Sequence, residues 1–344
     1  MTSMHSWTSK FFICVISFFV SLASLPSVSW SGDSLVVYSG RAERLIKPVL
    51  DAFQAESGIT IQMLTADTTA LVNRLNMEGE RSPADVFISN DAGTLERARE
   101  LHLLQAVNIP GIEAAIPQPF RAPDNSWIGL SGRIWVVVYN TTLVKPTDIT
   151  SILDLGQPKW KGKVAIPSAG SVYLQTGVSV IRELKGDAVA KNFLHGLREN
   201  AGTSVYGKNR QIVAAVARGE VAAGIVNHYY INRHLDKHPD APIAQLVPDQ
   251  GEHGMGVVLN AAGIGITKHA KHLAQAKALV KFLISSKGQQ MFASGNKEYP
   301  LNAKVHAAPE LLPLKSFHVA NVPLSRLAAL RDPTMTVIEA VGLR

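Results

Sequence analysis

The chain has 344 residues, of which 46% are hydrophobic and 18% are charged, and its formal net charge is +7. At about 150 residues per domain, this length predicts two domains with sizeable cores, and the low charge argues against a mainly disordered chain. The single cysteine excludes an intramolecular disulfide, a zinc ribbon and a CxxC redox centre. The positive net charge is compatible with nucleic acid, a membrane surface or an anionic ligand as a partner.

The first 29 residues are typical of a cleavable secretory signal peptide. Lys10 precedes an apolar run at 11–25 that is too short for an ordinary transmembrane span, and small residues permit cleavage near Ser29. An uncleaved membrane anchor is the alternative. Because Cys14 lies inside the run, cleavage would leave a secreted, soluble chain without cysteine.

The basic residues are scattered over the rest of the chain. Without Lys10 there remain 33 basic and 27 acidic residues, a net charge of +6. The densest group is three lysines within residues 158–163, which is more typical of a solvated turn than of a nucleic-acid patch. We therefore expect no nucleic-acid partner.

Short apolar runs alternate with helical patterns along the chain. They predict strands at 35–38, 59–64, 86–89, 134–139, 164–166, 222–226, near 246 and within 255–266. Apolar residues at helical spacing predict helices at 44–55, 69–77, 93–101, 174–185, 188–197, 210–217 and 273–284. Pro48 is tolerable only near a first turn, which leaves the start of the first helix open.

The opening order of strand, helix, strand and helix predicts a parallel sheet with helices on both faces. Two such α/β lobes with a cleft between them suit a binding protein, although an α/β enzyme fits the same coarse pattern. The chain contains no GxSxG, no HExxH and no GxGxxG opening a helix. His234 and His238 are four residues apart, which favours a solvated helix face over a metal pair. The absence of these motifs weakens the case for an enzyme without eliminating it, and we expect no catalytic residues.

Three tyrosines stand where predicted strands give way to helices. Tyr229 and Tyr230 directly follow the strand at 222–226, and Tyr173 follows the strand at 164–166. A phenol has a pKa of about 10, and a hard trivalent cation can deprotonate it. Three phenolates would balance the charge of Fe³⁺ with the oxygen ligands that it prefers. The alternative, which spacing alone favours, is that the paired tyrosines form an amphipathic rim of the core.

Seven motifs in order along the chain carry a resemblance to a known family: VYSGR (37–41), RSPADVF (81–87), LSGRI (130–134), PKWK (158–161), KN (208–209), NHYY (227–230) and EYPLN (298–302). Together they make nearly all of the chain beyond the signal resemble the periplasmic ferric-binding proteins of bacterial iron ABC transporters. The resemblance implies a transferrin-like, two-lobed binding protein of class II type. It also implies a monomer, not an enzyme, that captures Fe³⁺ in the periplasm and delivers it to an inner-membrane ABC permease.

The resemblance implies roles for the three tyrosines. The family's paired tyrosines bind the metal, which implies Tyr229 and Tyr230, and some members add a tyrosine that matches Tyr173. Other members use a histidine and a glutamate where this chain has Ala42 and Asn90. The chain is therefore similar to the tyrosine-rich type that uses carbonate.

Three tyrosine ligands would leave Fe³⁺ open to a carbonate-like anion. Arg41 and Arg133 lie in the family's cleft and hinge motifs, and a guanidinium grips a planar oxyanion well. The alternative for each arginine is a surface or hinge ion pair. Asn209 and Asn227 match positions that hydrogen-bond the anion in some relatives, and their alternative role is to cap helices.

The lobe boundaries and the rival functions complete the expectations from the sequence. We expect an N-terminal lobe from residues 33–134 and 260–310, and a C-terminal lobe from residues 135–259 and 311–344. The rival functions are a carrier of another anion or metal, and an α/β enzyme.

Overall fold

The computed structural model describes residues 34–343. The predicted signal peptide at 1–29, with Cys14, lies outside these residues. Among the residues that are described, no helix combines the length and the hydropathy needed to cross a membrane.

A single ten-stranded sheet runs through the described chain in the order β2-β1-β3-β9-β4-β7-β5-β6, with β8 and β10 also paired to β4. Its strands are β1 (Leu35–Ser39), β2 (Ile61–Thr65), β3 (Val86–Ser89), β4 (Trp127–Asn140), β5 (Val164–Pro167), β6 (Val205–Tyr206), β7 (Ala223–Asn227), β8 (Ile243–Leu246), β9 (Leu259–Ile266) and β10 (Tyr299–Pro300). The pairs of β1 with β2 and β3, and of β5 with β6 and β7, are parallel, as the sequence predicts. Strands β4 and β9 are antiparallel to their neighbours.

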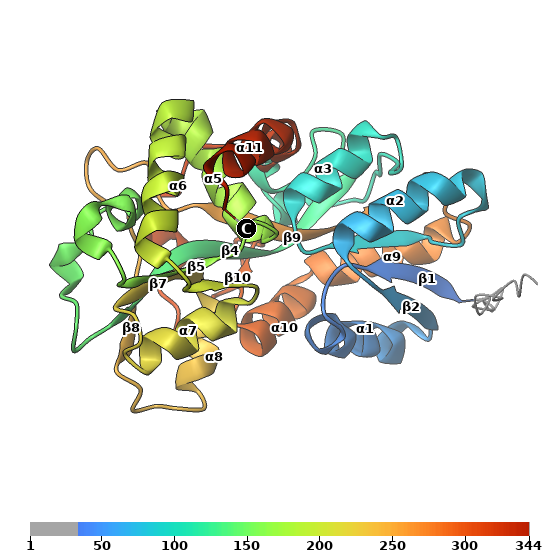
Figure 1. Cartoon of the computed structure of the whole chain (residues 1–344). Helices are drawn as coiled ribbons and strands as arrows, with labels where there is room; N and C mark the ends of the chain where they lie inside the picture. Colours follow the sequence, from blue (N-terminus) through green and yellow to red (C-terminus); the bar gives the residue numbers. More distant parts are fainter. Residues whose placement is uncertain (1–33, 344) are drawn as a thin grey trace, which may run out of the picture.

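Helices cover both faces of the sheet, which confirms the predicted α/β class (Figure 1). They are α1 (Glu43–Ser57), α2 (Thr68–Glu78), α3 (Ala92–Glu100), α4 (Ile112–Ala115), α5 (Val172–Lys185), α6 (Asp187–Ala201), α7 (Asn209–Ala217), α8 (Tyr229–Leu235), α9 (Leu273–Ile284), α10 (Ser286–Asn296) and α11 (Leu327–Val341). The predicted helix at 44–55 is α1, and it continues through Pro48.

Strand β4 is the common member of two halves of the sheet. Its first part pairs with β9 as far as Ile134, and its second part pairs with β7 and β8 from Trp135 onward. The prediction of a strand at 134–139 was therefore wrong in length. The missed part contains Gly129, where Leu301 and the carbonyl of Phe120 come so close that a β-carbon would not fit, so packing rather than β propensity put glycine there.

Helix α11 was not predicted, and neither was α10. Helix α11 packs against α5 and α6 and also against α3, which follows β3 in the other half of the sheet. Figure 1 shows it lying across these helices on one face of the sheet. The division into lobes at the predicted residue boundaries stays a prediction.

Neighbouring strands β5 and β7 determine where the predicted site lies. They are parallel, so their carboxyl ends lie at the same edge of the sheet. Helix α5 begins a few residues after β5, and α8 begins two residues after the end of β7. Residues that follow these two strands are therefore brought together.

Candidate functional site

The first turns of α5 and α8 carry the three predicted tyrosines. Tyr173 is the second residue of α5, and Tyr229 and Tyr230 are the first two residues of α8. The rings of Tyr229 and Tyr230 lie 4.5 Å apart between centroids, at 33°. The structure thus places the adjacent tyrosines in a first helical turn, the arrangement that lets neighbouring side chains reach one region.

The protonation of these phenols depends on their neighbours. Burial raises the pKa of Tyr229 well above its ordinary value, and the nearby Tyr173 and Tyr230 raise it further. Burial and Tyr173 also raise the pKa of Tyr230, although a hydrogen bond with Tyr229 lowers it in part. The three phenols therefore form one electrostatic group, and without a cation the two on α8 stay protonated at neutral pH.

Arg133 faces this group from β4. Its guanidinium carbon lies 5.5 Å from the ring centroid of Tyr173, and the residue is only 3% exposed. One terminal nitrogen donates to the carbonyl of Asn90, whereas Nε has no hydrogen-bond partner among residues 34–343. Burial opposes the charge of Arg133, but Tyr173, Tyr229 and Glu298 hold its pKa above the ordinary value. Arg133 is thus a buried cation with an unused donor beside the tyrosines.

Asn209 and Asn227 are bound to each other. Oδ1 of Asn209 accepts from the backbone N–H of Asn227 at 2.8 Å, and both residues are buried. Nδ2 of Asn227 has no partner within the described chain. Since Asn227 ends β7 and precedes the tyrosine pair by two residues, its free amide is a donor at the same edge of the sheet.

Arg41 is engaged in a buried ion pair with Glu298. It lies just after β1, 1% exposed, and its Nη2 donates to both oxygens of Glu298 at 3.0 and 2.8 Å. Its Nη1 donates to Oγ of Ser131, which itself donates to Glu298. Burial opposes ionisation of Glu298, but Arg41 and Arg133 keep the pKa of that carboxyl below its ordinary value. Arg41 thus forms an ion pair, as the alternative expected, but the pair is buried rather than on the surface, and an anion role for Arg41 stays a prediction.

Two buried residues near the site were missed as site residues. Glu298 lies in the EYPLN motif, but nothing in the sequence points to its partner Arg41. His228 precedes the tyrosine pair, and its Nδ1 accepts from the N–H of Ile134 while Nε2 bonds the carbonyl of Lys297. Burial lowers the pKa of His228 to about 4, so it ties β7 to β4 as a neutral ring.

The phenols are the metal donors that the sequence singled out. Among residues 34–343 no three His, Cys, Asp or Glu side chains form a group that could hold a metal ion. Asn90, which stands where other members of the family have glutamate, accepts a hydrogen bond from the hydroxyl of Thr68. Ala42 is the exposed residue before α1. The site therefore combines three phenols, one buried guanidinium and one free amide.

Two α/β halves that share long strands, with polar groups gathered at strand ends, define the class of two-lobed α/β binding proteins. The chain belongs to the family described as bacterial extracellular solute-binding proteins, whose model matches residues 35–295. This is a family of binding proteins and not of enzymes, which confirms the prediction of a non-enzymatic, two-lobed protein.

Known iron-uptake and ferric-ion-binding proteins are similar to this chain over nearly its whole length. Iron uptake protein A1 of Synechocystis is 30% identical over 89% of this chain and 86% of its own. Apo ferric ion-binding protein A of Pasteurella haemolytica is 30% identical and superposes with a TM-score of 0.84 over 90% of this chain and 98% of its own. The Trichodesmium protein IdiA (FutA), solved with iron and citrate, is 30% identical with a TM-score of 0.82 over 90% of this chain and 100% of its own.

Proposed function

We propose that this chain captures ferric iron in the periplasm and delivers it to the inner-membrane permease of an ABC transporter. The observation that carries the proposal is the convergence of Tyr173, Tyr229 and Tyr230 beside Arg133 at the shared end of β5 and β7. The relatives named for iron uptake and ferric-ion binding, and the extracellular family, support it.

The tyrosines are the proposed ligands of the transported ion. Phenolates are hard oxygen donors, and three of them cancel the charge of Fe³⁺. Because burial favours the protonated phenols in the iron-free protein, Fe³⁺ binds by displacing their protons. Weaker Lewis acids displace these protons less readily, so the site discriminates in favour of a trivalent ion.

A synergistic anion completes the proposed site. Arg133 supplies the charge and an N–H that has no partner in the described part of the chain, and Nδ2 of Asn227 supplies a second donor. A carbonate-sized oxyanion accepts from both, and a carboxylate of citrate offers the same chemistry. Asn209 supports this group indirectly, since it holds the backbone of Asn227. We expect the protein to act as a monomer without nucleic acid.

Absorption spectroscopy tests the ligand set. We expect Fe³⁺ with bicarbonate to produce a visible phenolate-to-iron charge-transfer band. Tyr229→Phe or Tyr230→Phe removes most of the band, and Tyr173→Phe weakens and shifts it. Tyr139→Phe is the matched control, because Tyr139 pairs with Ala223 at the opposite end of β7 from Asn227.

The outcome separates iron transport from its rival. A band that survives both Tyr229→Phe and Tyr230→Phe contradicts the ligand assignment. Tight binding of bicarbonate or citrate without any metal would favour a carrier of anions. Replacing bicarbonate with citrate in the same titration identifies which anion stabilises the iron complex.

A further inference from the structure

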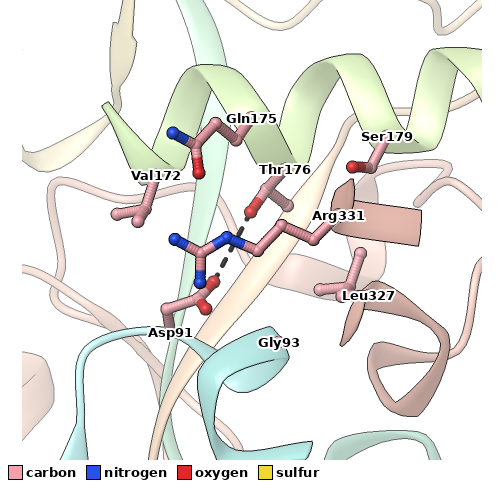
Figure 2. A pocket seen from close by; sticks show the side chains of 8 residues that line it. All are labelled: Asp91, Gly93, Val172, Gln175, Thr176, Ser179, Leu327 and Arg331. Atoms are coloured by element: carbon pink, nitrogen blue, oxygen red, sulfur yellow. Dashed lines mark hydrogen bonds between the residues drawn. The ribbon is translucent and has the colours of Figure 1, made fainter. Parts of the chain in front are cut away.

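A buried contact joins α5 to β9, the strand that pairs with Arg133, and to Asp91, which follows β3. Nδ2 of Asn260, on β9, donates to Oγ1 of Thr176 at 3.0 Å and to Oδ1 of Asp91 at 2.7 Å. Thr176 Oγ1 also lies 3.5 Å from the same oxygen of Asp91 (Figure 2). Asp91 follows β3 and Thr176 is on α5, so the contact crosses between the two halves of the sheet.

The direction of these hydrogen bonds is determined by their surroundings. Oδ1 of Asn260 accepts from the backbone N–H groups of Ala92 and Ala261, so its Nδ2 must be the donor to Thr176. The other oxygen of Asp91 accepts from the N–H and the hydroxyl of Thr94 at the start of α3. Asp91 and Asn260 are thus fixed by hydrogen bonds to residues near β3 and β9, and both contact Thr176 on α5.

Tyr173 and Thr176 are three residues apart on α5, so their side chains lie on the same face of the helix. Tyr173 contacts Arg133, which donates to the carbonyl of Asn90. Thr176 contacts Asp91, the next residue, and Asn260, which is the register partner of Arg133. Residues 90–91 and the paired residues Arg133 and Asn260 therefore contact α5 at two positions one turn apart, through Tyr173 and Thr176.

The two sides touch directly at this contact. The cavity lined by Asp91, Thr176, Gln175 and Arg331 measures about 20 Å³, room for about one water molecule. Asp91, Thr176 and Asn260 are all at least nine-tenths buried. The contact between α5 and the other half of the sheet is therefore direct, through side chains that are largely shielded from solvent.

We infer that Asp91 and Asn260, through their hydrogen bonds to Thr176, are positioning residues that hold Tyr173 at the metal site. The inference rests on the proposed function. None of the three touches the ion. They determine where the first turn of α5 lies against the opposite half, and therefore whether Tyr173 joins Tyr229 and Tyr230 around one ion.

Thr176→Val tests this inference, because it removes the hydroxyl and keeps the shape. Ser179→Ala is the matched control one turn along α5, since Ser179 bonds Thr334 of α11 instead (Figure 2 shows Ser179 beyond Thr176). In the iron-free protein we expect faster hydrogen exchange at the amides of residues 174–178 in Thr176→Val than in Ser179→Ala. Unchanged exchange in Thr176→Val overturns the inference.

Iron binding gives the second measurement. Loss of one buried hydrogen bond predicts that Thr176→Val weakens Fe³⁺ binding about tenfold and reduces the charge-transfer band, as Tyr173→Phe does. In a Tyr173→Phe background the same substitution should have almost no further effect, which a purely structural role would not produce. Additive effects overturn the inference. If the unaltered protein shows no band at all, the proposed function fails, and hydrogen exchange alone decides on the contact.

Discussion

The guanidinium of Arg41 donates to both carboxylate oxygens of Glu298, and neither residue is more than 1% exposed. The two charges neutralise each other inside the protein, next to the crossing strand β4 through Ser131. Removing one member of such a pair leaves an uncompensated buried charge, which costs about 3–5 kcal/mol.

Arg41 and Arg133 are therefore expected to behave differently. Arg41→Gln should lower the free energy of unfolding by that amount, about 3–5 kcal/mol, in denaturant titration. Arg133→Gln should lower stability less and should weaken bicarbonate-dependent iron binding at least about tenfold, because it removes the cation beside the tyrosines. A stable Arg41→Gln protein that has lost its dependence on bicarbonate would instead assign the anion to Arg41.

The Arg41–Glu298 pair also predicts a pH dependence of stability. The pKa of Glu298 is lower in the folded protein than the ordinary value of 4.5, despite burial, because of Arg41 and Arg133. Its stabilising contribution is therefore complete above the ordinary value and is lost as the pH falls through the lowered folded pKa. We expect the stability difference between the unaltered protein and Glu298→Gln to shrink on acidification below about pH 4.5. A difference that is constant with pH contradicts the pairing.

Substitutions of Asn209 and Asn227 should affect protein stability and anion-dependent iron binding to different degrees. Nδ2 of Asn227 is unpaired in the described chain, so Asn227→Ala should leave the free energy of unfolding nearly unchanged while weakening anion-dependent iron binding. Asn209→Ala would strand the buried N–H of Asn227 and should cost about 1–3 kcal/mol. Unfolding curves and iron titrations of both variants check this. Equal destabilisation by both would refute a free amide at Asn227.

Iron loading should release protons. Because burial raises the pKa of Tyr229 and Tyr230, the phenols are protonated before iron binds, and affinity should fall as the pH falls. Beyond the proton that bicarbonate gives up when it binds as carbonate, we expect the phenols to release about three protons per ion in weakly buffered solution, and one fewer in Tyr229→Phe. Tyr139→Phe should release as many as the unaltered protein. An identical count in Tyr229→Phe would exclude that phenol as a ligand.

Gly177 should tolerate no side chain. It lies on α5 where a β-carbon would come within 2.1 Å of the Trp135 ring on β4. Alanine is better than glycine in a helix by about 1 kcal/mol, but overpacking costs about 1–3 kcal/mol or more, so Gly177→Ala should destabilise the protein. Gly170→Ala, which meets nothing within 4 Å, is the control. Because α5 would be displaced, the charge-transfer band should also weaken.

Local patterns predicted most elements well where apolar residues were continuous. The helix predicted at 174–185 is α5 (Val172–Lys185), and the strand predicted at 86–89 is β3. Patterns failed where packing overrides propensity. Helix α11 contains Pro333, which locally argues against a helix, yet α11 forms because it packs against α3, α5 and α6.

The sequence by itself determined the α/β class, and it singled out tyrosines at two strand-to-helix edges because strand and helix periodicities are local properties. It could not show that β5 and β7 are neighbours, which brings Tyr173 to Tyr229 and Tyr230. Only the tertiary structure decided that Nε of Arg133 has no hydrogen-bond partner among residues 34–343, that Arg41 is paired with Glu298 and that Thr176 meets Asn260. The physical reason is that these contacts join residues 84–257 positions apart, where no local spacing constrains which groups meet.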